Sequence, residues 1–457
     1  MRNTDRAARV MILLVAVVLI SCILQVRAVA QSAGENTVYN STTTTGSTAF
    51  IDASKLVSGT TICDTLYGIL SAPGYIPSVI DARAITPSLT SMTCAAGKTP
   101  WQTSVSSTPI SAPSTILLPP GTIVIHTSWI LPANTRLIGE GDGLPSNGAL
   151  SGTTIQSAPS FTVPGAMIQF GYSSCSALCP AISIENLVLD GQGQSVSGIV
   201  NQYSQDHSFV DHVGLYRILG TGLLVSGSAE NSGPYSNIAF DTDGSATTST
   251  VCAQILAVSG GTHGIHGLTC KSSSTAYPPA AVLLDSSGNS LEDIAVSGFS
   301  DGVLVGSNAS ALSNVLINII GDTTRRPVAT PVNAIHISSA NPVEGLAIKG
   351  VSNSQLPGTY TIQDDLTALH LLDQYVAMYA AGKSSGGGYV RFTTSPNAPH
   401  WVTGKNSPSA SPCVRGSLYS CIGGGSGSTC YNGASGPAYA LWACVLNGSS
   451  VSWVPIM

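Results

Sequence analysis

Charge is scarce in this sequence, because only 9% of its 457 residues are Asp, Glu, Lys or Arg. The 17 Lys and Arg residues are outnumbered by 23 Asp and Glu residues, so the formal net charge is −6. A chain so poor in positive charge lacks the basic surface that contacts phosphate backbones, which excludes nucleic acid as a partner. No C-x-x-C spacing occurs, and the acidic residues are scattered, so neither a zinc nor a calcium site is expected. No cofactor is predicted.

Long apolar runs are also scarce, and the one that stands out lies near the N-terminus. Arg2, Arg6 and Arg9 precede "VMILLVAVVLI", and "AVA" at 28–30 is typical of a signal-peptidase site. Spanning a membrane needs about 20 apolar residues, and this run is shorter. Residues 1–30 are therefore predicted to be a signal peptide, and the protein to be secreted or held in the cell envelope. "LISC" at 19–22 resembles a bacterial lipobox, so a lipid anchor on Cys22 is the alternative.

Ten cysteines remain after the signal peptide, an even number that predicts disulfides in an oxidising compartment. They fall into local groups: Cys63 with Cys94, Cys175 with Cys179, Cys252 with Cys270, and Cys413, Cys421, Cys430 and Cys444 in the tail. The four tail cysteines allow three connectivities, and the sequence does not choose among them.

What the sequence has in abundance is a repeat. A frame of apolar, polar, Asn-like, apolar, small and apolar residues appears seven times at intervals of 21 to 31 residues. Its copies are "IENLVL" (184–189), "VDHVGL" (210–215), "YSNIAF" (235–240), "IHGLTC" (265–270), "LEDIAV" (291–296), "LSNVLI" (312–317) and "VEGLAI" (343–348). A second short apolar strand, such as "GLLV" at 222–225 or "GVLV" at 302–305, precedes most copies by roughly ten residues.

These strands recur in one phase and are too far apart for hairpins, so each is expected to pair with the same strand one coil later. The result is an all-β fold, a parallel β-helix solenoid. Frame positions one, four and six should face the core, and positions two and five should face out. The third position is expected to make a bend, because its occupants tolerate positive φ: Asn186, His212, Asn237, Gly267, Asp293, Asn314 and Gly345.

The N-terminal coils resemble the pectate lyase superfamily of right-handed β-helix proteins, which includes rhamnogalacturonase-like and epimerase-like members. The likeness rests on "GYIPSVIDARAI" (74–85), "STILLPPGTIVIHTSWILPANTRLIGEGDG" (114–143) and "GTTIQ" (152–156), and it extends over roughly residues 50–382. It implies a right-handed coil whose open end is covered by a short helix around "TICDTLYGILSAP" (61–73). It does not imply one activity, because the superfamily contains lyases, hydrolases and non-enzymatic binders.

The chain divides into four predicted segments. Residues 1–30 are the signal peptide, 31–112 an N-terminal segment with the capping helix, and 113–382 the parallel β-helix. Residues 383–457 follow as linker and C-terminal module, and "GKSSGGG" at 382–388 has a composition typical of a flexible linker. They continue into a small β module that holds four cysteines together with Trp401, Trp442 and Trp453. A module this small is expected to depend on disulfides.

The residue after frame position six supplies the candidate site. In successive coils it is Asp190, Tyr216, Asp241, Lys271, Ser297, Asn318 and Lys349, a row predicted to face outward. Asp190 and Asp241 would lie two coils apart, roughly 9.6 Å, close to the separation of an inverting pair of glycosidase carboxylates. Tyr216 and Lys271 are candidate substrate ligands, and Arg217 or Lys271 the candidate base of a lyase. The opposing interpretation is that "LDGQG" and "FDTDG" are ordinary Asp-Gly turns.

Two Asp-His pairs occur in "QDHSFVDHVGLYRI" (205–218). Asp211 and His212 fall on frame positions two and three and are interpreted as a surface residue and a bend. Asp206 and His207 lie in the loop before the strand, outside the frame, and remain catalytic candidates. His336 and His370 take the position that Leu224, Leu283 and Leu304 occupy in earlier coils, an apolar outer line that suggests cover by a loop, the tail or a partner.

Together these features predict an exported, carbohydrate-active β-helix protein that cleaves or binds a polysaccharide on the outer face of the coil. If it is an enzyme, it is expected to be a glycoside hydrolase or a polysaccharide lyase. The alternative is a non-catalytic surface or adhesive β-helix that binds glycans or a partner protein.

Overall fold

The structure, a computed structural model, describes residues 49–143, 152–161, 165–175, 178–244, 246–258, 260–272 and 278–306, and beyond these the strands from β19 onward. The predicted signal peptide, Cys22, His370, Cys413 and Cys430 lie outside the described residues. Neither described helix is long and apolar enough to cross a membrane.

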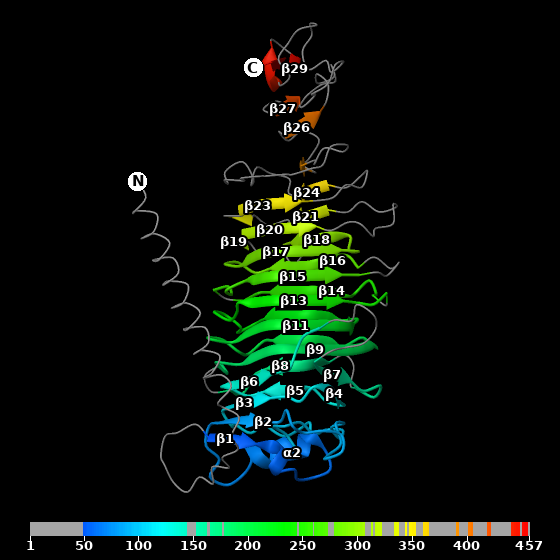
Figure 1. Cartoon of the computed structure of the whole chain (residues 1–457). Coiled ribbons are helices and arrows are strands. Elements are labelled where there is room, and N and C mark those ends of the chain that lie inside the picture. The colour runs from blue at the N-terminus through cyan, green and yellow to red at the C-terminus, as the bar shows by residue number, and fades with distance from the viewer. Residues whose placement is uncertain are drawn as a thin grey trace, which may run out of the picture.

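The described strands stack into a column with two long parallel sheets (Figure 1). The 13-stranded sheet consists of β1 (Ala49–Asp52), β2 (Ser78–Asp81), β3 (Ser114–Leu117), β4 (Gly121–Ile125), β6 (Thr135–Ile138), β7 (Thr153–Ser157), β9 (Ser183–Gln194), β11 (Phe209–Ile218), β13 (Tyr235–Asp241), β15 (Ile265–Lys271), β17 (Ser290–Ser297), β20 (Leu316–Gly321) and β23 (Ala347–Ser352). The 10-stranded sheet consists of β5 (Trp129–Leu131), β8 (Ala166–Phe170), β10 (Ser197–Asn201), β12 (Thr221–Ser226), β14 (Val251–Leu256), β16 (Ala280–Asp285), β18 (Asp301–Val305), β21 (Asn333–Ile337), β24 (Tyr360–Asp364) and β25 (Val390–Phe392).

From β9 to β18 the chain alternates between the two sheets, so each coil gives one strand to each. This arrangement confirms the predicted parallel β-helix. Parallel pairing already begins with β1 and β2, inside the segment assigned above to the N-terminal region. Smaller sheets follow later in the chain: β19 (Leu312–Ser313) pairs with β22 (Val343–Glu344), and β26 (Trp401–Gly404), β27 (Leu418–Cys421), β28 (Ala440–Asn447) and β29 (Ser450–Pro455) form a sheet of their own.

The repeat frame fits the coils closely. In β11 the residues at positions one, four and six, Val210, Val213 and Leu215, are all 0% exposed. The third-position residues have φ between 52° and 69° wherever the structure describes them: Asn186, His212, Asn237, Gly267 and Asp293. The predicted bend is therefore present in five successive coils. His212 is one of its members, and Asp211 beside it accepts a hydrogen bond from Asn237 at 2.8 Å, so this Asp-His pair is structural.

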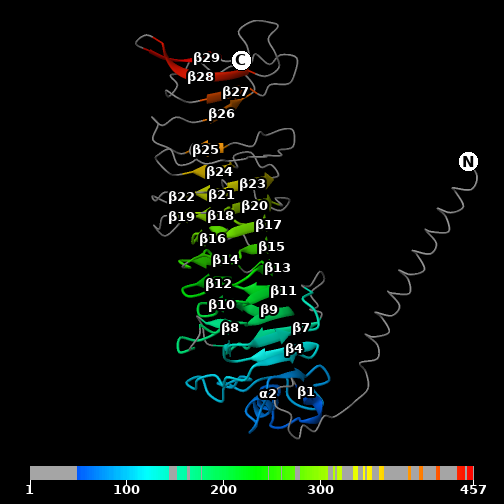
Figure 2. The same cartoon turned by 90° about the vertical axis from the view of Figure 1, so that its left-hand side faces the viewer.

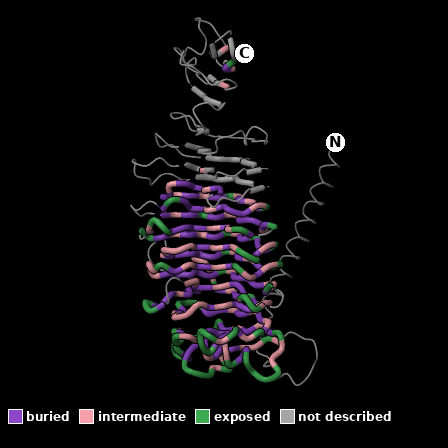
Figure 3. The backbone as a smooth tube through the Cα atoms, turned by 180° about the vertical axis from the view of Figure 1, so that it is seen from behind, coloured by how far each residue is buried: buried purple, intermediate pink, exposed green. Residues whose placement is uncertain are grey.

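The core is a continuous apolar column between the sheets. Ile184, Val210, Tyr235, Ile265 and Leu291 occupy position one of successive coils, and all are buried. Exposed residues gather at the turns and at the end of the column that holds the first strands (Figure 3). Because each coil rests on its neighbours, the core is assembled by stacking.

Three disulfides join the cysteines grouped by the sequence: Cys63 with Cys94, Cys175 with Cys179, and Cys252 with Cys270. The last joins β14 of the 10-stranded sheet to β15 of the 13-stranded sheet, and both cysteines are buried. Cys444 in the tail is also disulfide-bonded. These bonds indicate an oxidising environment.

Replacing both Cys252 and Cys270 by alanine is expected to lower the free energy of unfolding by about 3 kcal/mol, because their disulfide closes an 18-residue loop. The matched control replaces Cys175 and Cys179, only 4 residues apart, and should lower it by about 2 kcal/mol. Denaturant unfolding of the two variants measures both values. A larger loss for the short loop would contradict this ranking.

A short helix stands at the start of the column. The 3-10 helix η2 (Ala53–Lys55) is followed by α2 (Ile62–Leu70), whose Ile62, Leu66 and Ile69 are buried. The Thr61 side chain accepts a hydrogen bond from the Asp64 amide and begins α2. Figure 1 shows α2 at the same end of the column as β1 and β2. The helix therefore forms where the sequence predicts it.

Candidate functional site

Strand pairing places the predicted row on one line across four coils of the 13-stranded sheet. Tyr216 of β11 pairs with Asp190 of β9 on one side and with Asp241 of β13 on the other. Asp241 pairs in turn with Lys271 of β15. The register predicted from the repeat is thus confirmed for these four coils, and this part of the row spans roughly 14 Å along the column at one strand spacing per coil. Ser297 of β17 pairs with Lys271 and extends the row by one coil. The prediction is wrong beyond it, because Leu291 pairs with Ile317 and the register of β20 is shifted, so Asn318 does not lie beside Ser297 and pairs with Gly350 instead of Lys349.

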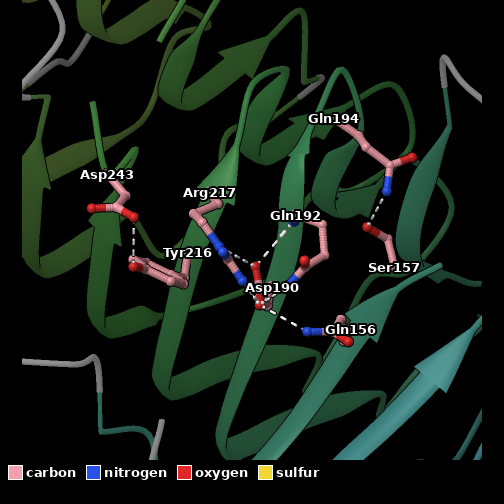
Figure 4. A network of polar contacts seen from close by, with 8 residues as sticks. All are labelled: Gln156, Ser157, Asp190, Gln192, Gln194, Tyr216, Arg217 and Asp243. Carbon is pink, nitrogen blue, oxygen red and sulfur yellow. Dashed lines mark hydrogen bonds and ion pairs between the residues drawn. The ribbon is translucent and has the colours of Figure 1, made fainter. Parts of the chain in front are cut away.

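Asp190 is the centre of a polar network (Figure 4). Its carboxylate is 0% exposed and receives Nε of Arg217 at 3.0 Å and Nη2 of Arg217 at 2.5 Å. It also accepts hydrogen bonds from the amide and side chain of Gln192 and from Gln156. A bidentate guanidinium and three further donors fill its acceptor sites, which is what a buried carboxylate requires.

The backbone of Arg217 is held in an uncommon conformation that aims its side chain at Asp190. Its φ is 48°, and the pairing of β11 with β9 shifts register between Tyr216 and Ile218. Gly191 lies against this bulge, and a Cβ there would come within 2.7 Å of the Arg217 carbonyl oxygen. Glycine at 191 therefore permits the close approach of the two strands. The hydrogen bonds to Asp190 raise the pKa of Arg217 above its ordinary value.

Tyr216 lies beneath Arg217, whose guanidinium carbon is 4.9 Å from the centre of the tyrosine ring. The tyrosine hydroxyl donates a hydrogen bond to Oδ2 of Asp243 at 2.9 Å. Burial, followed by the hydrogen bond to Asp243, raises the pKa of Tyr216 to about 12. Near neutral pH the phenol therefore keeps its proton and acts as a donor toward Asp243.

Asp243 is an exposed carboxylate held by two neighbours. Its φ is 50°, and its amide donates to Oδ1 of Asp241 at 2.9 Å, which closes a turn of the Asx type. Tyr216 holds the carboxylate itself. Asp241 also forms an ion pair with Lys271, and the side chains of this pair are 17% and 40% exposed. The arrangement leaves the Asp243 carboxylate exposed to solvent and oriented by the Tyr216 hydroxyl.

Two expectations about the row need correction. Both Asp190 and Tyr216 are predicted to face outward, but Asp190 is 0% and Tyr216 8% exposed. Arg217 of the next coil and two glutamines surround the Asp190 carboxylate, and the Arg217 guanidinium also lies over the Tyr216 ring. Both "LDGQG" and "FDTDG" form Asx turns, with Asp190 bound to the Gln192 amide and Asp241 to the Asp243 amide. The geometry gives no support to Asp190 and Asp241 as an inverting pair, since Asp190 cannot reach a substrate.

Asp206 and His207 lie far from this network. They occupy the turn before β11, whereas Tyr216 and Arg217 lie at the other end of that ten-residue strand. Both side chains are exposed, and the Asp206 carbonyl accepts a hydrogen bond from Ala181. The structure does not bring them to the row.

Sequence reasoning had set Asp243 aside as a turn residue and had not singled out Gln156 or Gln192. Asp243 and Gln192 share a detectable signal, because each stands two residues after a row aspartate and immediately before a glycine. Gln156 carries no such signal and is found only through the pairing of β7 with β9. Within the described part of the chain, no three His, Cys, Asp or Glu side chains are grouped to share a metal ion.

Comparison with known proteins adds partial likenesses. No family model and no curated protein sequence matches the chain. Among solved structures, the A-module of mannuronan C-5 epimerase AlgE4 from Azotobacter vinelandii is similar at 15% identity, over 60% of this chain and 91% of that one, with a TM-score of 0.30. ORF18 of Geobacillus virus E2 is similar at 12% identity, over 76% and 70%, with a TM-score of 0.38. The AlgE6 A-module of the same bacterium is similar at 15% identity, over 62% and 91%, with a TM-score of 0.24.

Proposed function

We propose that this protein is an exported, carbohydrate-active β-helix protein that acts on a polysaccharide lying along the row from Asp190 to Lys271. The observation that carries the proposal is the exposed Asp243 carboxylate, oriented by the buried Tyr216 hydroxyl at 2.9 Å within a row of polar side chains from consecutive coils. A linear polymer presents a hydroxyl or acidic group at every repeating unit. It can therefore contact several coils at once, each about 4.8 Å from the next.

In this proposal Asp243 transfers the proton. It meets the sugar directly, because it is exposed, whereas Tyr216 positions it by donating a hydrogen bond to Oδ2. A positioned carboxylate either delivers a proton to the glycosidic oxygen or removes one from water or from a carbon beside an acidic group. The first two steps belong to hydrolysis, in which water forms the new bond to the sugar carbon as the glycosidic C–O bond breaks. The last belongs to elimination, in which the C–O bond on the adjacent carbon breaks, a carbon–carbon double bond forms and the leaving oxygen takes a proton from water.

Arg217 and Lys271 are the proposed sugar ligands of the row. Asp190 takes two of the five N–H groups of Arg217, and the Arg217 side chain remains 31% exposed. Lys271 is 40% exposed and is held by Asp241. Asp190 and Asp241 are thus assigned to positioning these cations and not to catalysis.

One observation favours a second candidate, a non-catalytic glycan-binding or adhesive protein. Each cation of the row is already neutralised by a row aspartate, Arg217 by Asp190 and Lys271 by Asp241. With both cations paired, the Asp243 carboxylate carries the net charge of this group, and such a surface can bind a glycan through hydrogen bonds without a reaction. The ion-paired side chains of the row have the same role in both candidate functions, and only the role of Asp243 differs.

A panel of purified neutral and acidic polysaccharides tests the proposal. Incubation should release reducing ends from at least one of them, and ultraviolet absorbance of unsaturated uronates then distinguishes elimination from hydrolysis. Binding without any release would establish the non-catalytic candidate. Neither binding nor release on any member would contradict both.

Two finer features of the fold belong to the same proposal. The coil is right-handed, and α2 covers the open end of the apolar column, fixed by the Cys63–Cys94 disulfide. The sheet of β26 to β29 is the disulfide-stapled terminal module, in which Trp442 is 8% exposed and contributes to a small core. Export fits the disulfides, which form in oxidising compartments.

A further inference from the structure

The outer face of the 10-stranded sheet carries an uncharged stripe. Strand pairing puts one residue from each strand on a single line: Ile130, Gln169, Val200, Leu224, Gln254, Leu283 and Leu304. Every member is partly exposed. The stripe side chains point away from the core. For Leu224 this follows because its strand neighbours Leu223 and Val225 are 0% exposed and side chains alternate along a strand. Figure 2 shows β8, β10, β12, β14 and β16 stacked one above another along the column.

Charge is nearly absent from these strands. From β5 to β18 of the 10-stranded sheet, the described strand residues include only two charged side chains, Asp285 and Asp301, which are 5% and 8% exposed. The outer face of the 13-stranded sheet differs, since its strands carry Arg136, Glu185, Asp211, Lys271 and Glu292 at least partly exposed. The two outer faces of the column are therefore chemically distinct.

We propose that a second copy of this chain packs on the uncharged stripe, so that two columns associate through their 10-stranded sheets. The chain has a net charge of −6, which makes like-charge repulsion the main obstacle to self-association. The uncharged stripe is a surface where two copies meet without facing equal charges. Its five apolar side chains supply the area that association removes from water.

The area of the stripe limits the affinity of the proposed dimer. The stripe ends at β18, because the next residue on the line is His336 of β21, which pairs with Asp301. Seven strands from β5 to β18 extend roughly 29 Å at one strand spacing each, and five residues extend about 16 Å. That is on the order of 500 Å² on each copy and about 1,000 Å² in the pair, the lower limit for a specific interface. A weak dimer follows, with a dissociation constant on the order of micromolar.

Sedimentation velocity over a range of protein concentration tests this pairing. The native protein should pass from monomer to dimer across roughly 1 to 100 μM. Leu224→Lys should remain monomeric throughout, because it places two like charges near the centre of the interface. Ser236→Lys is the matched control, since Ser236 is a partly exposed residue of the same coil on the other sheet, and it should dimerise as the native protein does.

Leu224→Gln is a milder second variant in case Leu224→Lys does not fold. It is expected to fold because glutamine already occupies the stripe at 169 and 254. It should weaken the dimer about tenfold while leaving circular dichroism and the melting temperature unchanged. A native protein that stays monomeric at 100 μM would overturn the proposal. So would a well-folded Leu224→Lys variant that dimerises as strongly as Ser236→Lys. None of these measurements uses a polysaccharide, so their results do not depend on whether the proposed function is correct.

Discussion

Replacing Asp190 by alanine is expected to lower the free energy of unfolding by about 3 kcal/mol. Breaking a buried ion pair costs about 3 to 5 kcal/mol, because the remaining charge loses its partner. The lower end applies here, since the Arg217 side chain is 31% exposed and water compensates part of its charge. Gln156 and Gln192 lose their acceptor as well. Denaturant unfolding followed by circular dichroism measures the change.

The matched control is Asp241→Ala, because Asp241 is the next aspartate of the row and lies two coils from Asp190. It removes the same kind of Asx turn and an ion pair to Lys271, but both of its partners are partly exposed, so the expected loss is about 1 kcal/mol or less. The double variant Asp190→Ala with Arg217→Ala should recover part of the stability lost by Asp190→Ala alone. Equal losses for the two aspartates would show that the burial of Asp190 does not govern its contribution.

Replacing Asp243 by asparagine is expected to reduce kcat on the polysaccharide identified by the panel by about 100- to 10,000-fold, with KM nearly unchanged. This is the usual contribution of a positioned acid or base, and asparagine keeps the shape of the side chain while losing its proton transfer. The fold should be unaffected because Asp243 is exposed. Steady-state kinetics on the native protein and the variant give both constants.

Tyr216→Phe provides the graded comparison, because it removes only the hydroxyl that holds Asp243 and keeps the ring beneath Arg217. A positioning role predicts a smaller loss of kcat than that of Asp243→Asn. If the protein is instead a binder, Asp243→Asn removes one hydrogen bond and weakens glycan binding by about tenfold. A variant enzyme within threefold of native kcat would exclude Asp243 from the reaction.

The fold followed from the sequence because a parallel β-helix repeats its local rules in every coil. Apolar residues at three frame positions and a residue tolerant of positive φ at the third recur in each copy, and no copy depends on a distant partner to define its strand. His212 shows the strength of this argument: its place in the frame identified it as a bend residue, and its φ is 52°. The same frame predicted that Asp190, Tyr216, Asp241 and Lys271 would pair in one row.

The repeat frame did not predict which side chains of the row are buried or which hydrogen-bond partners they have. The frame gives the direction of a side chain but says nothing about what covers it. Asp190 points outward and is nevertheless buried, because the bulge at Arg217 folds a guanidinium over it from the next coil. The sequence around Asp243 is that of an ordinary Asp-Gly turn, and nothing in it indicates that the Tyr216 hydroxyl donates a hydrogen bond to this carboxylate.

The sequence by itself thus predicted the coil and the register of the row from Asp190 to Lys271, both of which depend on short, repeated spacings. It also grouped the six cysteines that form the first three disulfides. Only the tertiary structure decided which aspartate of the row is buried and which faces solvent. Those contacts join residues 27 positions apart, Asp190 to Arg217 and Tyr216 to Asp243, across coils whose loops differ in length. Side chains that meet across such coils leave no periodic trace in the chain, because each contact is made once.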